Sequence, residues 1–107
     1  MQPDPTLLEE LVRRIIAVAH PLRIILFGSA ARGDMGPDSD LDVLVVMPDG
    51  THRRRTAQEI YRNMWGFGFA KDIVVVTESD VQEYGSNPYM IIKNVLEEGR
   101  ELYHAPR

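Results

Sequence analysis

Residues 28–42 read Gly-Ser-Ala-Ala-Arg-Gly-Asp-Met-Gly-Pro-Asp-Ser-Asp-Leu-Asp. A short apolar run precedes them at residues 23–27, and a second one begins at their end, at residues 41–47. We interpret both runs as buried strands, because short apolar runs bounded by glycine and turn residues are typical of such strands. The connection of residues 28–39 has only the dozen residues that a crossover needs at minimum, and its three glycines and one proline predict a loop rather than a full crossover helix. We therefore expect these two strands to pair antiparallel.

The rest of the chain alternates between helical and strand patterns. Apolar residues of the run at 41–47 fall on both faces, so we expect a sheet that is covered on both sides. The fold class is therefore α/β (α+β): a small mixed sheet flanked by helices, rather than a doubly wound fold, in one domain over residues 1–107. The tail at 101–103 is expected either to pair with a sheet edge or to pack. The expected helices cover residues 6–20, 51–65 and 88–98, and the expected strands cover 23–27, 41–47 and 69–76.

The composition of the chain limits the classes of function that it can have. The formal net charge is −4 in 107 residues, so we expect no direct nucleic-acid binding through a broad basic surface. The absence of cysteine excludes disulfides and thiolate chemistry. No apolar stretch approaches the ~18 residues that a membrane helix requires, and the N-terminus does not resemble a secretory signal. We expect a cytoplasmic protein with no membrane association, and the apolar helix faces leave a homo-oligomer open.

Two carboxylates open the second expected strand. Asp40 and Asp42 are two residues apart, so their side chains point to the same face of a strand. Carboxylate oxygens at this spacing suit hard cations such as Mg²⁺. The alternative is that Asp40 caps a turn and Asp42 is a solvated strand residue, but an uncompensated carboxylate beside a buried strand is costly.

A third carboxylate, Asp72, lies near the start of another apolar strand, directly after Lys71. It is a candidate to hold a metal and to accept a proton from an attacking hydroxyl. The alternative is a polar strand-end residue paired with a neighbouring cation.

The turn between the first two strands supplies groups suited to phosphate. Gly28 lacks the Cβ that would block a close backbone approach, and Ser29 adds a hydroxyl donor. Arg32 lies in the same connection, where it could contact a triphosphate or be an ordinary surface arginine. In an antiparallel pair, the end of the first strand and the start of the second meet at one edge of the sheet. We therefore expect Gly28 and Ser29 to lie beside Asp40 and Asp42.

The run from Gly28-Ser29 through Arg32 to Asp40-Leu41-Asp42 resembles the signature of the minimal nucleotidyltransferases of the DNA polymerase beta-like nucleotidyltransferase superfamily. This resemblance implies transfer of a nucleoside monophosphate, AMP from ATP, to a hydroxyl, with two Mg²⁺ ions and release of pyrophosphate. It implies that Asp40, Asp42 and Asp72 are the catalytic and metal-binding residues. Gly28, Ser29 and Arg32 would then bind the nucleotide.

The resemblance also implies a partner. Minimal members resemble antitoxins encoded beside a helical HEPN-domain toxin, and some of them transfer AMP to that toxin. We therefore expect a protein adenylyltransferase-like antitoxin with a HEPN-domain partner. A non-catalytic antitoxin that neutralises its partner by contact is the alternative. The sequence does not identify the nucleotide, the acceptor hydroxyl or the stoichiometry.

Overall fold

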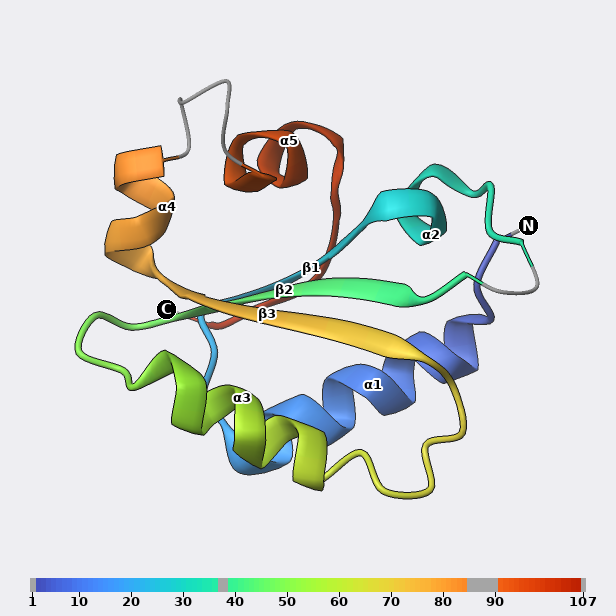
Figure 1. Ribbon diagram of the computed structural model, residues 1–107, viewed down its shortest axis with the longest axis horizontal. Helices are drawn as coiled ribbons and strands as arrows, with labels where there is room; N and C mark the ends of the chain where they lie inside the picture. The colour runs from blue at the N-terminus through green and yellow to red at the C-terminus, as the bar shows by residue number, and fades with distance from the viewer. Residues whose placement is uncertain (1, 37–38, 85–90, 107) are drawn as a thin grey trace.

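The computed structural model describes residues 2–36, 39–84 and 91–106, and its helices lie on both sides of one sheet (Figure 1). No helix within those ranges is long and apolar enough to cross a membrane. The elements in chain order are α1 (Pro5–Val18), β1 (Arg23–Phe27), α2 (Gly28–Arg32), β2 (Leu41–Met47), α3 (Arg53–Arg62), β3 (Lys71–Thr77), α4 (Glu78–Tyr84), α5 (Ile91–Glu98) and β4 (Arg100–His104).

The four strands form one mixed sheet in the order β3-β2-β1-β4. Strand β1 is antiparallel to β2, which confirms the expectation from the short connection, and it is also antiparallel to β4. Strand β2 is parallel to β3. As a result β1 ends at the same edge of the sheet at which β2, β3 and β4 begin.

Helices cover both faces of the sheet, as the apolar pattern of β2 predicts. Alternate residues of each strand point to opposite faces, so Val43 and Val45 join one apolar cluster and Leu44 and Val46 join another. The first cluster contains the buried side chains of α1 together with Ile60 of α3. The second contains residues of α5. Figure 1 shows the same arrangement, with α1 and α3 below the sheet and α4 and α5 above it.

Local hydrogen bonds set several helix starts. Asp4 caps α1, since its carboxylate accepts from the backbone N–H of Thr6 at 2.9 Å. Helix α4 begins with a reciprocal cap: the Asp80 carboxylate accepts from the backbone N–H of Thr77, and the Thr77 hydroxyl accepts from that of Asp80. The sequence predicts that the last helix begins at residue 88, and residues 88–90 lie outside the described ranges.

Several element boundaries differ from the sequence-based expectation. The second long helix ends at Arg62 rather than at residue 65, because a turn follows and leaves Trp65 outside the core. The third strand begins at Lys71 rather than at residue 69, because pairing starts where Leu41 of β2 meets Lys71. The tail forms β4, an outer strand of the sheet that pairs with β1, which is one of the two arrangements expected for it.

Candidate active site

The sheet brings the predicted carboxylates to one edge. Asp42 of β2 is the register partner of Asp72 on the parallel strand β3. Neighbouring strands lie about 4.8 Å apart, and register partners on them point to the same face. Asp40 is two residues before Asp42 and directly precedes β2. The structure therefore places Asp42 and Asp72 side by side, with Asp40 at the entry to the same strand.

The carboxylates lie on the face of the sheet that α4 and α5 cover. Asp42 points to the same face of the sheet as Leu44, and Asp72 to the same face as Val74, because residues two apart on a strand share a face. Leu44 and Val74 pack in the cluster that contains α5. Asp42 is half-buried, whereas Asp40 and Asp72 are exposed. The apolar face thus ends in acidic groups that solvent and a ligand can reach.

The described residues offset the negative charges at this edge only in part. Burial, and then the negative charges of Asp72 and Asp40, raise the pKa of Asp42, while Arg32 opposes the increase. Within the described part of the chain, none of the three carboxylates has an ion pair or a hydrogen-bond donor. Such like charges are stabilised by a bound cation, and their oxygen atoms are the ligands that Mg²⁺ prefers.

The donor set therefore fits Mg²⁺ in its chemistry. Over the described ranges, however, no group of three or more acidic or histidine side chains is gathered closely enough to hold a metal ion as it stands. The exposed Asp40 and Asp72 side chains would have to turn toward Asp42 to complete such a group.

Gly28 forms a close contact with the buried carboxylate. Its φ is +71°, a left-handed conformation that favours glycine. A Cβ placed there would overlap the Oδ2 atom of Asp42 and lie 3.3 Å from its Cγ. Phe27, the residue before it, is the register partner of Asp42. The turn after β1 thus packs against the carboxylate, as the spacing of the two motifs predicts.

Ser29 and Arg32 lie on α2, the single short helix that starts at this turn. The Ser29 carbonyl accepts from the backbone N–H of Asp34 at 3.1 Å, which closes the turn. The exposed Arg32 guanidinium forms an ion pair with Asp34 at 3.4 Å, a contact worth little in solvent. Arg32 also acts electrostatically on Asp42. Both predicted residues are therefore near the carboxylate edge, and the Arg32 side chain is available to an anion.

A small cavity of about 190 Å³ adjoins this turn, between it and α5. Phe27, Gly28 and Arg32 line one side, and Asn94, Val95 and Glu98 line the other. The sequence did not indicate Asn94 or Glu98, because polar residues on an amphipathic helix usually face solvent. A larger hollow of about 440 Å³ lies between α1 and β4, but it contains none of the predicted residues, so we place the site at the carboxylates.

The basic start of α3 has a structural explanation. Cations at a helix N-terminus oppose the helix dipole, so the basic residues at 52–55 would be stabilised by an anionic neighbour or by solvent. Arg53 forms an ion pair with Asp80 at 2.9 Å, and His52 caps the helix by accepting from the backbone N–H of Arg55. This part of the chain is therefore not needed to explain the site.

The mixed four-stranded sheet flanked by helices is the fold of a nucleotidyltransferase domain. The model of the family described as "Nucleotidyltransferase domain" matches residues 6–102. The chain belongs to this family. No curated protein matches the sequence at a significant level.

Solved structures share the fold. One is a proposed nucleotidyltransferase from Sulfolobus solfataricus, with a TM-score of 0.62 and 22% sequence identity over 92% of this chain and 78% of that chain. Another comes from a crystal structure of a toxin–antitoxin with AMP-PNP, with a TM-score of 0.53 and 22% identity over 91% of this chain and 73% of that one. At this identity the likeness establishes the fold, which is the nucleotidyltransferase fold expected from the sequence.

Proposed function

We propose that the protein is a Mg²⁺-dependent nucleotidyltransferase that transfers AMP from ATP to a hydroxyl group of a partner protein. The observation that carries this proposal is the register pairing of Asp42 with Asp72, with Asp40 two residues before Asp42, at the sheet edge beside Gly28. A dead site has no physical reason to keep like charges together, since their repulsion is unfavourable without a cation. Family membership supports transferase chemistry.

The reaction forms a bond between the acceptor oxygen and the α-phosphorus and breaks the bond from that phosphorus to the bridging oxygen of pyrophosphate. Asp40, Asp42 and Asp72 would hold Mg²⁺, which supplies neutralisation of charge on the phosphates. Gly28 lets the nucleotide approach the backbone of the turn, and Arg32 contributes a positive charge to the phosphates. Asp72 is exposed, so it can orient the acceptor hydroxyl and take its proton.

We further propose that the acceptor belongs to a helical HEPN-domain partner and that the chain acts as an antitoxin. One structural neighbour comes from a toxin–antitoxin crystallised with AMP-PNP, which supports both a protein partner and an adenine nucleotide. The exposure of Asp72 and Asp40 also suits an acceptor that is presented by a separate macromolecule.

The test is co-expression with the product of the neighbouring open reading frame, followed by intact-mass measurement of that partner. The proposal predicts that the partner gains mass in AMP-sized steps with the wild-type chain and gains none with Asp42→Asn. Glu9→Gln serves as the control and should behave as the wild type, because Glu9 is an exposed acid on α1, which covers the face of the sheet opposite to the carboxylates. An unmodified partner in a tight complex would instead support neutralisation by contact.

A further inference from the structure

Trp65 is the most exposed large apolar residue that the structure describes. It is the single tryptophan of the chain, and 89% of its surface is accessible. This exposure excludes a place for Trp65 in the core. A tryptophan held in solvent contributes nothing to the fold, whereas tryptophan is among the residues that contribute most at protein interfaces.

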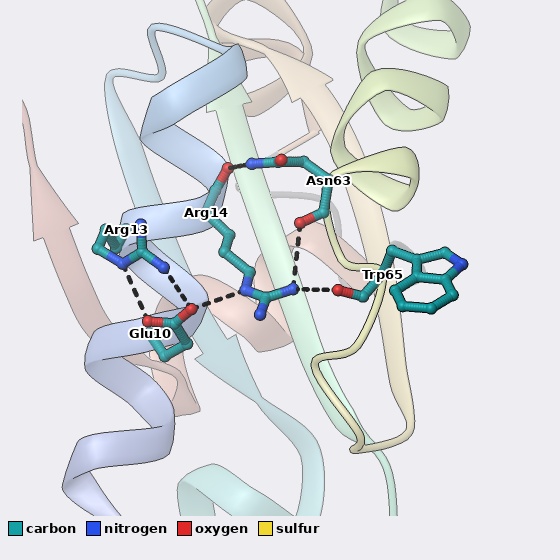
Figure 2. Close-up of polar contacts among 5 residues, drawn as sticks. All are labelled: Glu10, Arg13, Arg14, Asn63 and Trp65. Carbon is teal, nitrogen blue, oxygen red and sulfur yellow. Dashed lines mark hydrogen bonds and ion pairs between the residues drawn. The ribbon is translucent and has the colours of Figure 1, made fainter.

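The turn that carries Trp65 is fixed to α1 (Figure 2). The guanidinium of Arg14 donates to the backbone carbonyls of Trp65 at 2.8 Å and of Asn63 at 3.3 Å. The amide of Asn63 donates in return to the Arg14 carbonyl at 2.8 Å. Glu10 orients Arg14 through an ion pair at 2.7 Å. The position of the turn is therefore set before any partner binds, which lowers the entropy that binding costs.

Figure 2 shows the indole pointing away from α1 while its backbone is held. Next to it along the seam between α1 and α3 lies a shallow hollow of about 440 Å³, lined by Val18, Glu59, Arg62 and Asn63. Val18 adds exposed apolar surface, at 38%. Asn63 lines the hollow, and Arg14 holds the backbone carbonyls of both Asn63 and Trp65, so the exposed ring and the hollow are neighbours. We call this surface the Trp65 face: Val18, Glu59, Arg62, Asn63 and Trp65.

We propose that the Trp65 face pairs with the same face of a second copy of this chain, so that Trp65 of each copy enters the hollow of the other. A two-fold interface brings a surface against itself and therefore requires a self-complementary patch. On this face the projecting Trp65 ring and the hollow are neighbours. Either one alone would fit many partners, but both on a single face fit a second copy.

Charge on the face is self-complementary as well. Glu59 and Arg62 have opposite charges, lie about one helical turn apart on α3, and line the same hollow. Neither has an ion pair within the described ranges. Antiparallel apposition of two such helices sets Glu59 of each copy against Arg62 of the other, and it places an arginine where it can lie over an entering indole.

The size of the face indicates a weak dimer. A buried tryptophan removes roughly 150–250 Å² from solvent, so two would supply about a third of the roughly 1,200 Å² at the lower limit for specific interfaces. The hollows and the stems of Arg62 add to this area. Because α1 and α3 cover the face of the sheet opposite to the carboxylates, this pairing leaves the acidic edge open and does not depend on the proposed function.

The test is sedimentation velocity of the purified wild-type chain across the micromolar range, together with its tryptophan emission. We expect a monomer–dimer equilibrium and a blue shift of emission that grows with concentration, since the single tryptophan reports its own burial. Trp65→Ala should be monomeric throughout. Ile16→Ala, which shortens another exposed apolar side chain on α1, should dimerise as the wild type does.

Charge reversal identifies the contact. Glu59→Arg and Arg62→Glu should each weaken dimerisation at least tenfold, and the double variant should recover most of the loss, because the pair is re-formed across the two-fold axis. A wild-type chain that stays monomeric with unshifted emission would overturn the proposal. So would a dimer that persists in Trp65→Ala, or an emission shift that appears only when a single-stranded oligonucleotide is added.

Discussion

Replacing Gly28 by alanine tests the contact on which the site depends. At φ +71° an alanine pays the strain of the left-handed conformation, about 1–2 kcal/mol. Its Cβ would also overlap Oδ2 of Asp42, and relief of such overpacking costs roughly a further 1–3 kcal/mol. Reduced freedom of the unfolded chain returns about 0.4–1 kcal/mol. We therefore expect a net loss of about 2–4 kcal/mol.

Gly50 provides the matched control. Its φ is +87° and nothing lies within 4 Å of the position of its Cβ, so Gly50→Ala should lose only the conformational part, about 1 kcal/mol. At roughly 4 °C per kcal/mol for a domain of this size, the melting temperature should fall by about 10 °C for Gly28→Ala and by about 4 °C for Gly50→Ala. Differential scanning calorimetry measures both.

Removal of the Asp42 carboxylate should relieve the additional loss. In a double-mutant cycle, Gly28→Ala and Asp42→Ala should show a coupling of about 1–3 kcal/mol. Equal losses for Gly28→Ala and Gly50→Ala, or additive effects in the cycle, would refute the close packing of the turn on the carboxylate.

Three further predictions concern charge and anchoring. Burial and then the charges of Asp72 and Asp40 raise the pKa of Asp42, so its ionised form destabilises the fold. Asp42→Asn should therefore raise the melting temperature of the free protein at neutral pH. In a pH series this increase in melting temperature should vanish as the pH falls to the ordinary pKa of 3.8. The backbone N–H of Thr77 lowers the pKa of Asp80, so Asp80→Asn should cost about 0.5–2 kcal/mol near neutral pH, and the difference should disappear as acid protonates Asp80 below 3.8; a constant difference would exclude the cap. Arg14→Ala should cost about 1–3 kcal/mol in chemical denaturation and should speed proteolysis in the turn at 63–66, whereas unchanged proteolysis would show that Arg14 does not hold it.

The order of the three main helices and of the first three strands could be predicted from the sequence, as could the meeting of the Gly28 turn with the start of β2. Apolar periodicity is a local signal, and the strand at 41–47 and the short connection before it fixed an antiparallel pair. The two-residue spacing of Asp40 and Asp42 determined their common face. The position of Asp72 beside Asp42 could not be derived from sequence spacing alone, because its register against β2 depends on parallel pairing between strands that are distant in the chain.

What could not be predicted depends on contacts between distant segments. The second long helix ends at Arg62 because Arg14, 49 and 51 residues away, takes the carbonyls of Asn63 and Trp65. That interaction has no local signature, and the helical pattern alone continued through Trp65. The same holds for Asn94, which faces the cavity beside Gly28 only because α5 packs over the end of β1.

The central claim is that Asp40, Asp42 and Asp72 together hold the metal of a nucleotidyl-transfer site. Electron paramagnetic resonance of Mn²⁺, titrated in the presence of a non-hydrolysable ATP analogue, counts the ions bound. We predict two ions for the wild-type chain, as in two-metal phosphoryl transfer, a loss of binding in Asp42→Asn, and wild-type binding in Glu9→Gln. Failure of the wild-type chain to bind Mn²⁺ with the nucleotide, or undiminished binding in Asp42→Asn, would contradict the account.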